Sequence, residues 1–374
     1  MQSECLIVTQ CFYPDVGGIE GLMTGLADHC ASSGRSVTVL AERIRHKLLH
    51  PVTPKPYDII RFAGPRPWRR WRKRACLDGI VKRRGENIAG IFVDSWKSVE
   101  ALPAHLKMPV TMLAHGMEYP TDATPAKKRR ICSALARCSA IVANSRYTAG
   151  LVLPYLDGNA QKLQMIHPPI APMPEPKADT VARLRDRIGC RHPVIATVAR
   201  LEPRKGIDAV IRALPDVLTR HAGCIYAIAG TGEDRERLEQ LTVDLNVREA
   251  VLFLGRVSSS EKAALLAIAD VFAMPVRREG RSVEGFGLSY SEAGWFSVPS
   301  LAGRDGGAGD AVVDGETGLL CDGASQSEIT SSLISLLDDE ALRERLGAAA
   351  QVRVKNELIW PIVIDRYLDS FRGC

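Results

Sequence analysis

Short apolar runs alternate with longer amphipathic segments through the first part of the chain. Residues 6–10 and 35–42 are apolar runs, and between them lie a glycine-containing loop and a segment at 19–34 with helical periodicity. This order predicts strand, loop, helix and strand, which is the opening of a parallel α/β unit. Further buried strands are predicted at 90–95, 109–116 and 140–145, and a helix at 123–139.

The alternation starts again after a proline-rich stretch at 162–180, which predicts a linker. Two doubly wound units follow from this pattern, so the expected fold is α/β, with two Rossmann-like domains facing a central cleft. The expected boundaries are 1–168 and 169–358. In the second unit, strands are predicted at 193–200, 224–230, 251–256, 270–276 and 299–303, and helices at 206–221, 233–245, 259–269 and 287–297.

The amino-acid composition indicates the class of protein. Of the 374 residues, 46% are apolar and 25% charged, which is typical of a soluble globular chain. The first residues, MQSECLIVTQCF, lack a basic segment before the apolar one, so we read them as a buried strand and not as a signal peptide. The ten cysteines form no CxxC pair, which favours free thiols in the cytoplasm over zinc ligands.

One short segment concentrates the positive charge. The run RPWRRWRKR carries six basic residues and the indoles of Trp68 and Trp71. The run is compatible with a solvated loop or helix face, with contact to an anionic membrane surface, and with binding to a nucleic acid. We favour the membrane over nucleic acid because no nucleic-acid motif accompanies the run. The basic residues are Arg66, Arg69, Arg70, Arg72, Lys73 and Arg74.

Glycines follow two of the predicted strands. Gly17 and Gly18 come between the first strand and the first helix, where backbone amides approach an anion easily, although a plain turn also explains the pair. Gly230 and Gly232 follow a strand of the second unit, but the third glycine of a dinucleotide fingerprint is replaced by Arg235. Binding of NAD is therefore only an alternative.

Charged and titratable residues lie at other strand ends. Arg200 and Lys205, in VARLEPRKG, are placed to neutralise a diphosphate, whereas two solvated surface cations are the simpler alternative. His115 directly follows an apolar strand and either lines a site or is structural. The chain contains no DxD motif, so a bound diphosphate would need side-chain cations in place of a chelated metal.

Two glutamates in VEGFGLSYSEA form the most informative motif. Glu284 precedes a glycine-rich turn, and Glu292 lies more than one turn inside the helix that follows. The amides from Gly285 to Leu288 would form an anion-binding rim between two carboxylates suited to sugar hydroxyls. A helix-start glutamate followed by a solvated one is the alternative.

These motifs together resemble a retaining glycosyltransferase of family 4 with the GT-B fold. The resemblance rests on DVGGIE, HGME, ARLEPRKG, GTGED, LGRV and EGFGLSYSE, and it covers nearly the whole chain. It implies that the segment 359–374 packs back on the first domain. It also implies transfer of a hexose without a metal or other cofactor, with GDP-mannose as the first candidate donor and UDP-sugars as the second.

The resemblance also implies a role for each candidate residue. Glu284 would hold the transferred hexose, Glu292 the ribose, and Arg200 with Lys205 the diphosphate. His115 would contact the donor hexose, and the backbone of Val257 the base. The remaining donor-side residues are Gly17, Gly18, Gly285, Phe286, Gly287 and Leu288.

The implied acceptor is a lipid-linked glycan or the lipopolysaccharide core, which would place the protein at the inner face of the cytoplasmic membrane. Three other interpretations remain open: a two-domain NAD-linked oxidoreductase, a non-catalytic binding protein of the same fold, and a nucleic-acid binder.

Overall fold

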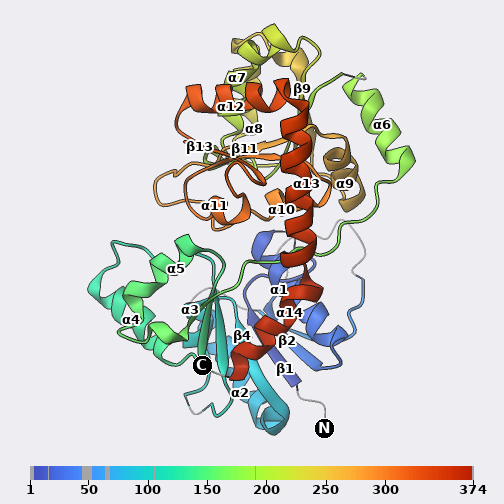
Figure 1. Cartoon of the computed structure of the whole chain (residues 1–374). Helices are drawn as coiled ribbons and strands as arrows, with labels where there is room; N and C mark the ends of the chain where they lie inside the picture. The colour runs from blue at the N-terminus through green and yellow to red at the C-terminus, as the bar shows by residue number, and fades with distance from the viewer. Residues whose placement is uncertain are drawn as a thin grey trace. The chain divides into compact units, whose positions relative to one another are not determined.

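The computed structural model describes residues 4–15, 17–43, 53–63, 68–104, 106–189 and 191–372. The chain divides into two compact units (Figure 1). Unit 1 comprises Met1–Ala171 and Trp360–Cys374, and unit 2 comprises Pro172–Ile359. The division at 171/172 lies three residues beyond the expected boundary at 168, and the C-terminal segment belongs to unit 1. That the two units face a common cleft stays a prediction.

Unit 1 is built on a parallel sheet whose described strands lie in the order β3-β2-β1-β4-β5-β6-β7. Successive residues of β1 point to opposite faces, and both faces are buried: Leu6 and Val8 join one apolar cluster, Cys5 and Ile7 another. The strands are β1 (Glu4–Thr9), β2 (Ser36–Glu42), β3 (Asp58–Phe62), β4 (Ile88–Val93), β5 (Val110–Ala114), β6 (Ala140–Ala143) and β7 (Leu163–Met165).

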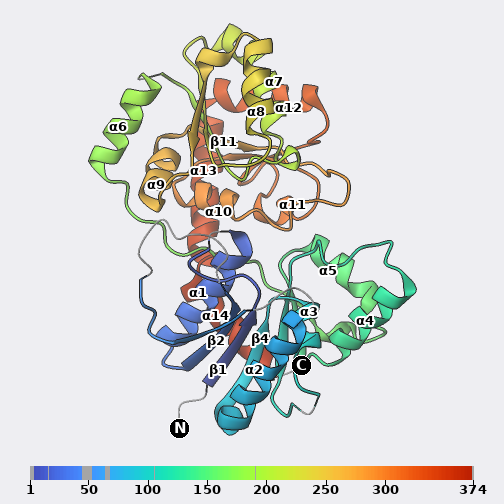
Figure 2. The same cartoon turned by 180° about the vertical axis from the view of Figure 1, so that it is seen from behind.

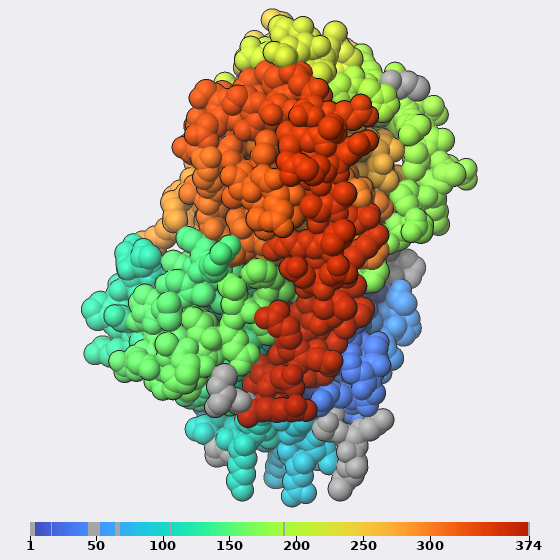
Figure 3. All heavy atoms as spheres, in the orientation of Figure 1, coloured from blue at the N-terminus to red at the C-terminus, as the bar shows by residue number. Residues whose placement is uncertain are grey.

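Helices cover both faces of this sheet. One face packs against α1 (Gly18–Ser32) and α14 (Trp360–Asp369), and Figure 3 shows α14 at the surface of unit 1 beside α1. The other face packs against α2 (Arg69–Arg84), α3 (Trp96–Glu100) and α4 (Pro125–Ala136), which Figure 2 shows from behind. A shorter helix, α5 (Arg146–Val152), follows β6.

Unit 2 repeats the plan with the described strand order β10-β9-β8-β11-β12-β13. Its strands are β8 (Val194–Val198), β9 (Ile225–Ala229), β10 (Val251–Gly255), β11 (Val271–Met274), β12 (Ser300–Gly303) and β13 (Gly318–Cys321). Its helices are α6 (Ala178–Ile188), α7 (Ile207–Arg220), α8 (Arg235–Asp244), α9 (Ser259–Ile268), α10 (Leu288–Trp295), α11 (Ala308–Ala311), α12 (Gln326–Asp338) and α13 (Glu340–Glu357).

Both sheets therefore share one topology, and the expected doubly wound α/β fold is confirmed for each unit. The strand order reverses between β1 and β4 in unit 1 and between β8 and β11 in unit 2. The connections that follow these two neighbouring strands run toward opposite edges of the sheet. A crevice therefore opens at the carboxyl ends of the strands, which is where such sheets bind ligands.

Candidate functional site

Glu284 and two cations meet at the reversal point of the unit 2 sheet. The chain leaves β8 through a 3-10 turn at Pro203–Lys205, and it leaves β11 through the loop that carries Glu284. Arg204 donates from a terminal guanidinium nitrogen to Oε2 of Glu284 at 2.9 Å, and Lys205 donates from Nζ to the same oxygen. The two cations are only 8% and 9% exposed. One carboxylate thus holds two buried positive charges.

The electrostatics of this cluster keep Glu284 ionised. Burial alone would raise the pKa of Glu284, but the charges of Lys205 and Arg204 and their hydrogen bonds outweigh it, so the pKa lies below its ordinary value. Buried cations need such a partner, since an unpaired buried charge is costly. The arrangement offers a carboxylate for hydroxyl groups and, beside it, cations for an anion.

Glycines fix the backbone around the cluster. Gly206 has φ 72°, and a Cβ there would lie 2.1 Å from the carbonyl oxygen of Pro275. Gly306 has φ 74°, and Gly307 N–H donates to the carbonyl oxygen of Glu284 at 2.8 Å. These close approaches are possible only without side chains, so the glycines set where the loops after β8 and β11 meet.

The start of α10 lies beside this carboxylate. Gly287 is the N-cap residue with φ 95°, and no side chain caps the helix. Ser289 Oγ donates to the carbonyl oxygen of Val198 at 2.8 Å, which ties the helix start to the end of β8. Phe286 is buried, so a ligand would meet its backbone and not its ring. At the neighbouring Gly285 and Leu288 a ligand would also meet the backbone. Uncapped amides at a helix start attract anions.

Arg200 does not join the cluster. Its side chain is 73% exposed and pairs with Glu202 at 2.9 Å. The cation that sequence reasoning missed is Arg204, which lies between Pro203 and Lys205 and contacts both Glu202 and Glu284. Its position beside Lys205 in PRKG was the available signal. The expected role of Arg200 stays a prediction.

Glu292 lies in α10 as expected, and its carboxylate pairs with Nζ of Lys262. Lys262 belongs to α9, which begins two residues after Val257 and is capped by Ser258. Val257 itself is half-buried against the apolar cluster formed with α6 and α9. Val257 lies just before α9, and Lys262 of α9 pairs with Glu292, so α9 links the two predicted residues. Lys262 is a second residue that sequence reasoning missed.

In unit 1, His115 follows β5 directly. Its backbone N–H donates to Oε1 of Glu118 at 2.7 Å. Its Nε2 is buried and has no hydrogen-bond partner among the described residues. Buried polar atoms usually have a hydrogen-bond partner, so Nε2 of His115 is available to a ligand group or a water molecule. Gly18 begins α1, and a side chain there would meet nothing within 4 Å, whereas at Gly17 it would meet the carboxylate of Glu20.

The basic run forms the start of α2, with one correction. Lys73 is buried, not part of a surface patch: it points inward because Nζ donates to Ser98 Oγ at 2.6 Å, and burial lowers its pKa despite the nearby Asp94. Arg69 pairs with Glu42 at 3.1 Å. The exposed members are Trp68, Arg70, Trp71, Arg72 and Arg74, and Arg66 lies outside the described residues.

The described ranges contain neither a metal-binding cluster nor a membrane-spanning helix. No group of three or more His, Cys, Asp or Glu side chains there is arranged to hold a metal ion. Among the same residues, no helix has the length and apolar character to cross a membrane. The metal independence expected from the sequence is not tested by this finding.

The chain matches known families in both units. Residues 16–172 match the family described as Glycosyltransferase Family 4, and residues 185–353 match Glycosyl transferases group 1. A GDP-mannose-dependent alpha-(1-6)-phosphatidylinositol monomannoside mannosyltransferase of Mycolicibacterium smegmatis is 42% identical over 47% of this chain and 47% of its own length. An enzyme of Corynebacterium glutamicum that acts on the monoacylated form is 40% identical over 46% and 45%. The chain thus spans about half the length of these curated relatives.

A solved structure resembles the whole chain. HepE of Anabaena, in complex with UDP and glucose, aligns with a TM-score of 0.78 over 99% of this chain and 100% of its own, at 17% identity. At that identity the likeness shows the fold alone. With one family match in each unit and this fold throughout, the chain belongs to glycosyltransferase family 4, whose two Rossmann-like domains form the GT-B fold.

Proposed function

We propose that the protein is a retaining hexosyltransferase that moves mannose from GDP-mannose to a lipid-linked acceptor without a metal ion. The observation that carries the proposal is the cluster of Glu284, Arg204 and Lys205 at the reversal point of the unit 2 sheet. It combines a carboxylate for sugar hydroxyls with cations for a diphosphate, at the position where such sheets bind ligands.

In this proposal the donor replaces part of the internal pairing. Glu284 accepts hydrogen bonds from hexose hydroxyls, and Lys205 turns from Glu284 to the diphosphate together with the more exposed Arg200. Arg204 stays on Glu284, where its second contact to Glu202 at 2.8 Å anchors it. The amides from Gly285 to Leu288 bind the remaining phosphate oxygens. Once the donor is bound, cations that already contact the diphosphate stabilise the charge that develops there with little further reorganisation.

The rest of the donor is assigned to α9 and α10. Glu292 binds the ribose after releasing Lys262, and the backbone of Val257 meets the base. His115 of unit 1 forms a hydrogen bond to the donor hexose through Nε2, and Gly18 leaves open space at the start of α1. At Gly17, where Glu20 fills the side-chain space, the backbone would approach the donor.

The proposed reaction needs no covalent intermediate. The bond from C1 of the hexose to the diphosphate oxygen breaks, and the acceptor hydroxyl oxygen forms its bond to C1 on the same face. The acceptor proton passes to the leaving phosphate oxygen. Catalysis then depends on positioning and on stabilising the leaving diphosphate by Lys205 and the helix-start amides.

The names of the relatives support the donor and the acceptor class. Two relatives at about 40% identity are named as GDP-mannose-dependent enzymes acting on a phosphatidylinositol mannoside. A UDP-sugar is the second candidate, because HepE was solved with UDP and glucose. A glycolipid or the lipopolysaccharide core as acceptor would place the protein at the inner face of the cytoplasmic membrane, with the exposed Trp68 and Trp71 at the lipid surface.

A panel of nucleotide sugars, scored for release of free nucleotide, tests this function. We expect GDP-mannose to be turned over fastest, in the presence of a chelator as well as with magnesium. NAD is the control ligand, and it should produce no thermal shift. Strict dependence on a divalent ion, or a shift with NAD and none with any nucleotide sugar, would contradict the proposal.

A further inference from the structure

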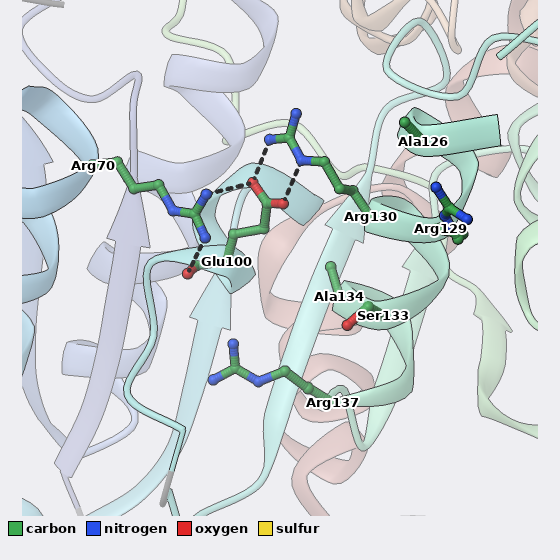
Figure 4. Close-up of a pocket in the computed structure, with 8 residues that line it drawn as sticks. All are labelled: Arg70, Glu100, Ala126, Arg129, Arg130, Ser133, Ala134 and Arg137. Atoms are coloured by element: carbon green, nitrogen blue, oxygen red, sulfur yellow. Dashed lines mark hydrogen bonds and ion pairs between the residues drawn. The ribbon is translucent and has the colours of Figure 1, made fainter. Parts of the chain in front are cut away.

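Unit 1 contains a positively charged pocket that has no part in the proposed donor site. The pocket has a volume of about 460 Å³ and lies between the start of α2, the end of α3 and one face of α4 (Figure 4). Four arginines and one glutamate line it, a formal excess of three positive charges. The lining residues are Arg70, Glu100, Ala126, Arg129, Arg130, Ser133, Ala134 and Arg137.

Glu100 is shared between two of these arginines. Arg130 donates from Nε and a terminal nitrogen to the two carboxylate oxygens at 2.9 and 2.8 Å. Arg70 lies farther away, with 3.9 Å between its nitrogen and Oε2. Figure 4 shows both guanidinium groups directed at this carboxylate. Arg70 also donates to the backbone carbonyl oxygen of Glu100 at 3.5 Å, and its side chain is exposed, so its long contacts leave it able to turn to another anion.

The other two arginines have no carboxylate partner among the residues that the structure describes. Arg137 donates to the backbone carbonyls of Val99, Leu102 and Pro103, which fixes its guanidinium but leaves its charge uncompensated. Arg129 forms no ion pair within the described residues. Like charges gathered around one hollow repel each other, so the arrangement is stabilised when an anion enters.

The shape of the pocket suits a small oxyanion. Ala126, Ser133 and Ala134 lie on the same face of α4 as the arginines and keep the space between them open, and Ser133 adds a hydroxyl group. Arg130 is further oriented by stacking over the buried ring of Trp96 at 5.3 Å. Planar guanidinium groups form paired hydrogen bonds with the oxygens of a phosphoryl group, as they do with those of a carboxylate, and several guanidinium groups can share one phosphoryl group.

We propose that this arginine pocket binds the phosphoryl group of a phosphoester, with Arg129, Arg130 and Arg70 donating to its oxygens. The phosphoester is either the headgroup of an anionic lipid or a soluble phosphate. Arg70 belongs to the same start of α2 as Trp68 and Trp71, which are 61% and 66% exposed, so a lipid surface that takes up the indoles would bring its headgroups near the pocket.

The test uses the full chain and two ligands. Binding is measured to phosphatidylcholine vesicles with and without phosphatidic acid, and to glycerol phosphate in solution. Arg129→Ser should weaken binding about tenfold, because one charge-assisted contact is lost. Lys128→Ser is the matched control: it removes the same charge from the neighbouring position of α4, outside the pocket, and should change binding less than about twofold.

A variant that should strengthen binding makes the test stricter. Glu100→Gln keeps the shape of the side chain but removes the competing charge, so it should strengthen binding severalfold. Binding to the vesicles alone would identify the lipid headgroup as the source, and binding to glycerol phosphate as well would identify soluble phosphoesters. The proposal is overturned if the wild-type protein binds neither ligand, or if Arg129→Ser and Lys128→Ser weaken binding equally.

Discussion

At the scale of single residues, the candidate site is built around one carboxylate, Glu284, with two cationic partners. Glu284 was expected from the sequence because it precedes a glycine turn, and Lys205 because it follows a strand. That the two form an ion pair was beyond the sequence, since 79 positions separate them and only the parallel sheet brings their loops together. Arg204 was overlooked for the same reason, and Lys73 was misassigned because a run of basic letters does not show which one faces inward.

Replacing Glu284 by Gln should make the stability of unit 2 depend differently on pH. Because the pKa of Glu284 is lowered in the folded state, the ionised carboxylate stabilises the fold at pH values above its ordinary pKa. This stabilisation is lost as the pH falls through the folded-state pKa. At pH 7 the variant leaves the buried Lys205 without its carboxylate and leaves Arg204 with Glu202 as its carboxylate partner, so we expect it to lose about 3 kcal/mol of unfolding free energy.

Chemical denaturation at pH 7 and at mildly to strongly acidic pH measures this effect. The difference in unfolding free energy between wild type and variant should become smaller as the pH falls well below 4.5, the ordinary pKa of the carboxyl group. A difference that stays constant over that range would show that the ion pair is not formed.

At the scale of elements, the glycine turn before α10 is the critical connection. Gly287 has φ 95°, and a Cβ there would lie 2.5 Å from the ring of Tyr290. That ring cannot easily move, because it is buried and its hydroxyl donates to the carbonyl oxygen of Met274 at 2.5 Å. The geometry of the helix start, and with it the direction of the amides near Glu284, therefore depends on this glycine.

Gly287→Ala should destabilise unit 2 by about 3 kcal/mol, from left-handed backbone strain and from the contact with Tyr290. Gly280→Ala is the matched control, because its φ is 59° but nothing lies within 4 Å of the added carbon. We expect the control to cost about 1 kcal/mol. Thermal or urea denaturation compares the two variants, and equal losses would contradict the proposed contact.

Periodicity predicted most of the central strands and the long helices, because these are buried on both faces or amphipathic. It missed β3, β7 and β13. The first of these, DIIRF, is a short edge strand, and the other two have only three and four residues, so none gives a clear apolar run. It left α2 undecided, because the basic run suits a loop or a helix face, and it missed α6, which begins inside the stretch expected to be a linker.

At the scale of the whole molecule, unit 1 is discontinuous in sequence. The segment from Trp360 completes it, and the Trp360 ring is buried, stacks on His29 at 5.3 Å and fills the space that a side chain at Gly25 would need. The stability of unit 1 therefore includes the last helix, although all of unit 2 separates that helix from the rest of the unit in the chain.

Trp360→Ala should lower the unfolding free energy of unit 1 by about 3–5 kcal/mol, as for other large-to-small core substitutions. Hydrogen exchange followed by mass spectrometry reports the two units separately. Peptides of β1, β2 and α1 should exchange faster, and peptides of unit 2 should not change. Ile362→Ala, at an exposed position of the same helix, is the control and should have little effect. Faster exchange in unit 2 to the same extent would contradict this assignment.

The central claim is that Lys205 and its partners stabilise the leaving diphosphate of a nucleotide sugar. The most direct measurement is the rate of GDP release from GDP-mannose, with a chelator present, by the wild-type protein and by Lys205→Ala. Loss of about 3 kcal/mol of transition-state stabilisation should slow the variant about 10²-fold. Unchanged turnover in Lys205→Ala would contradict the account.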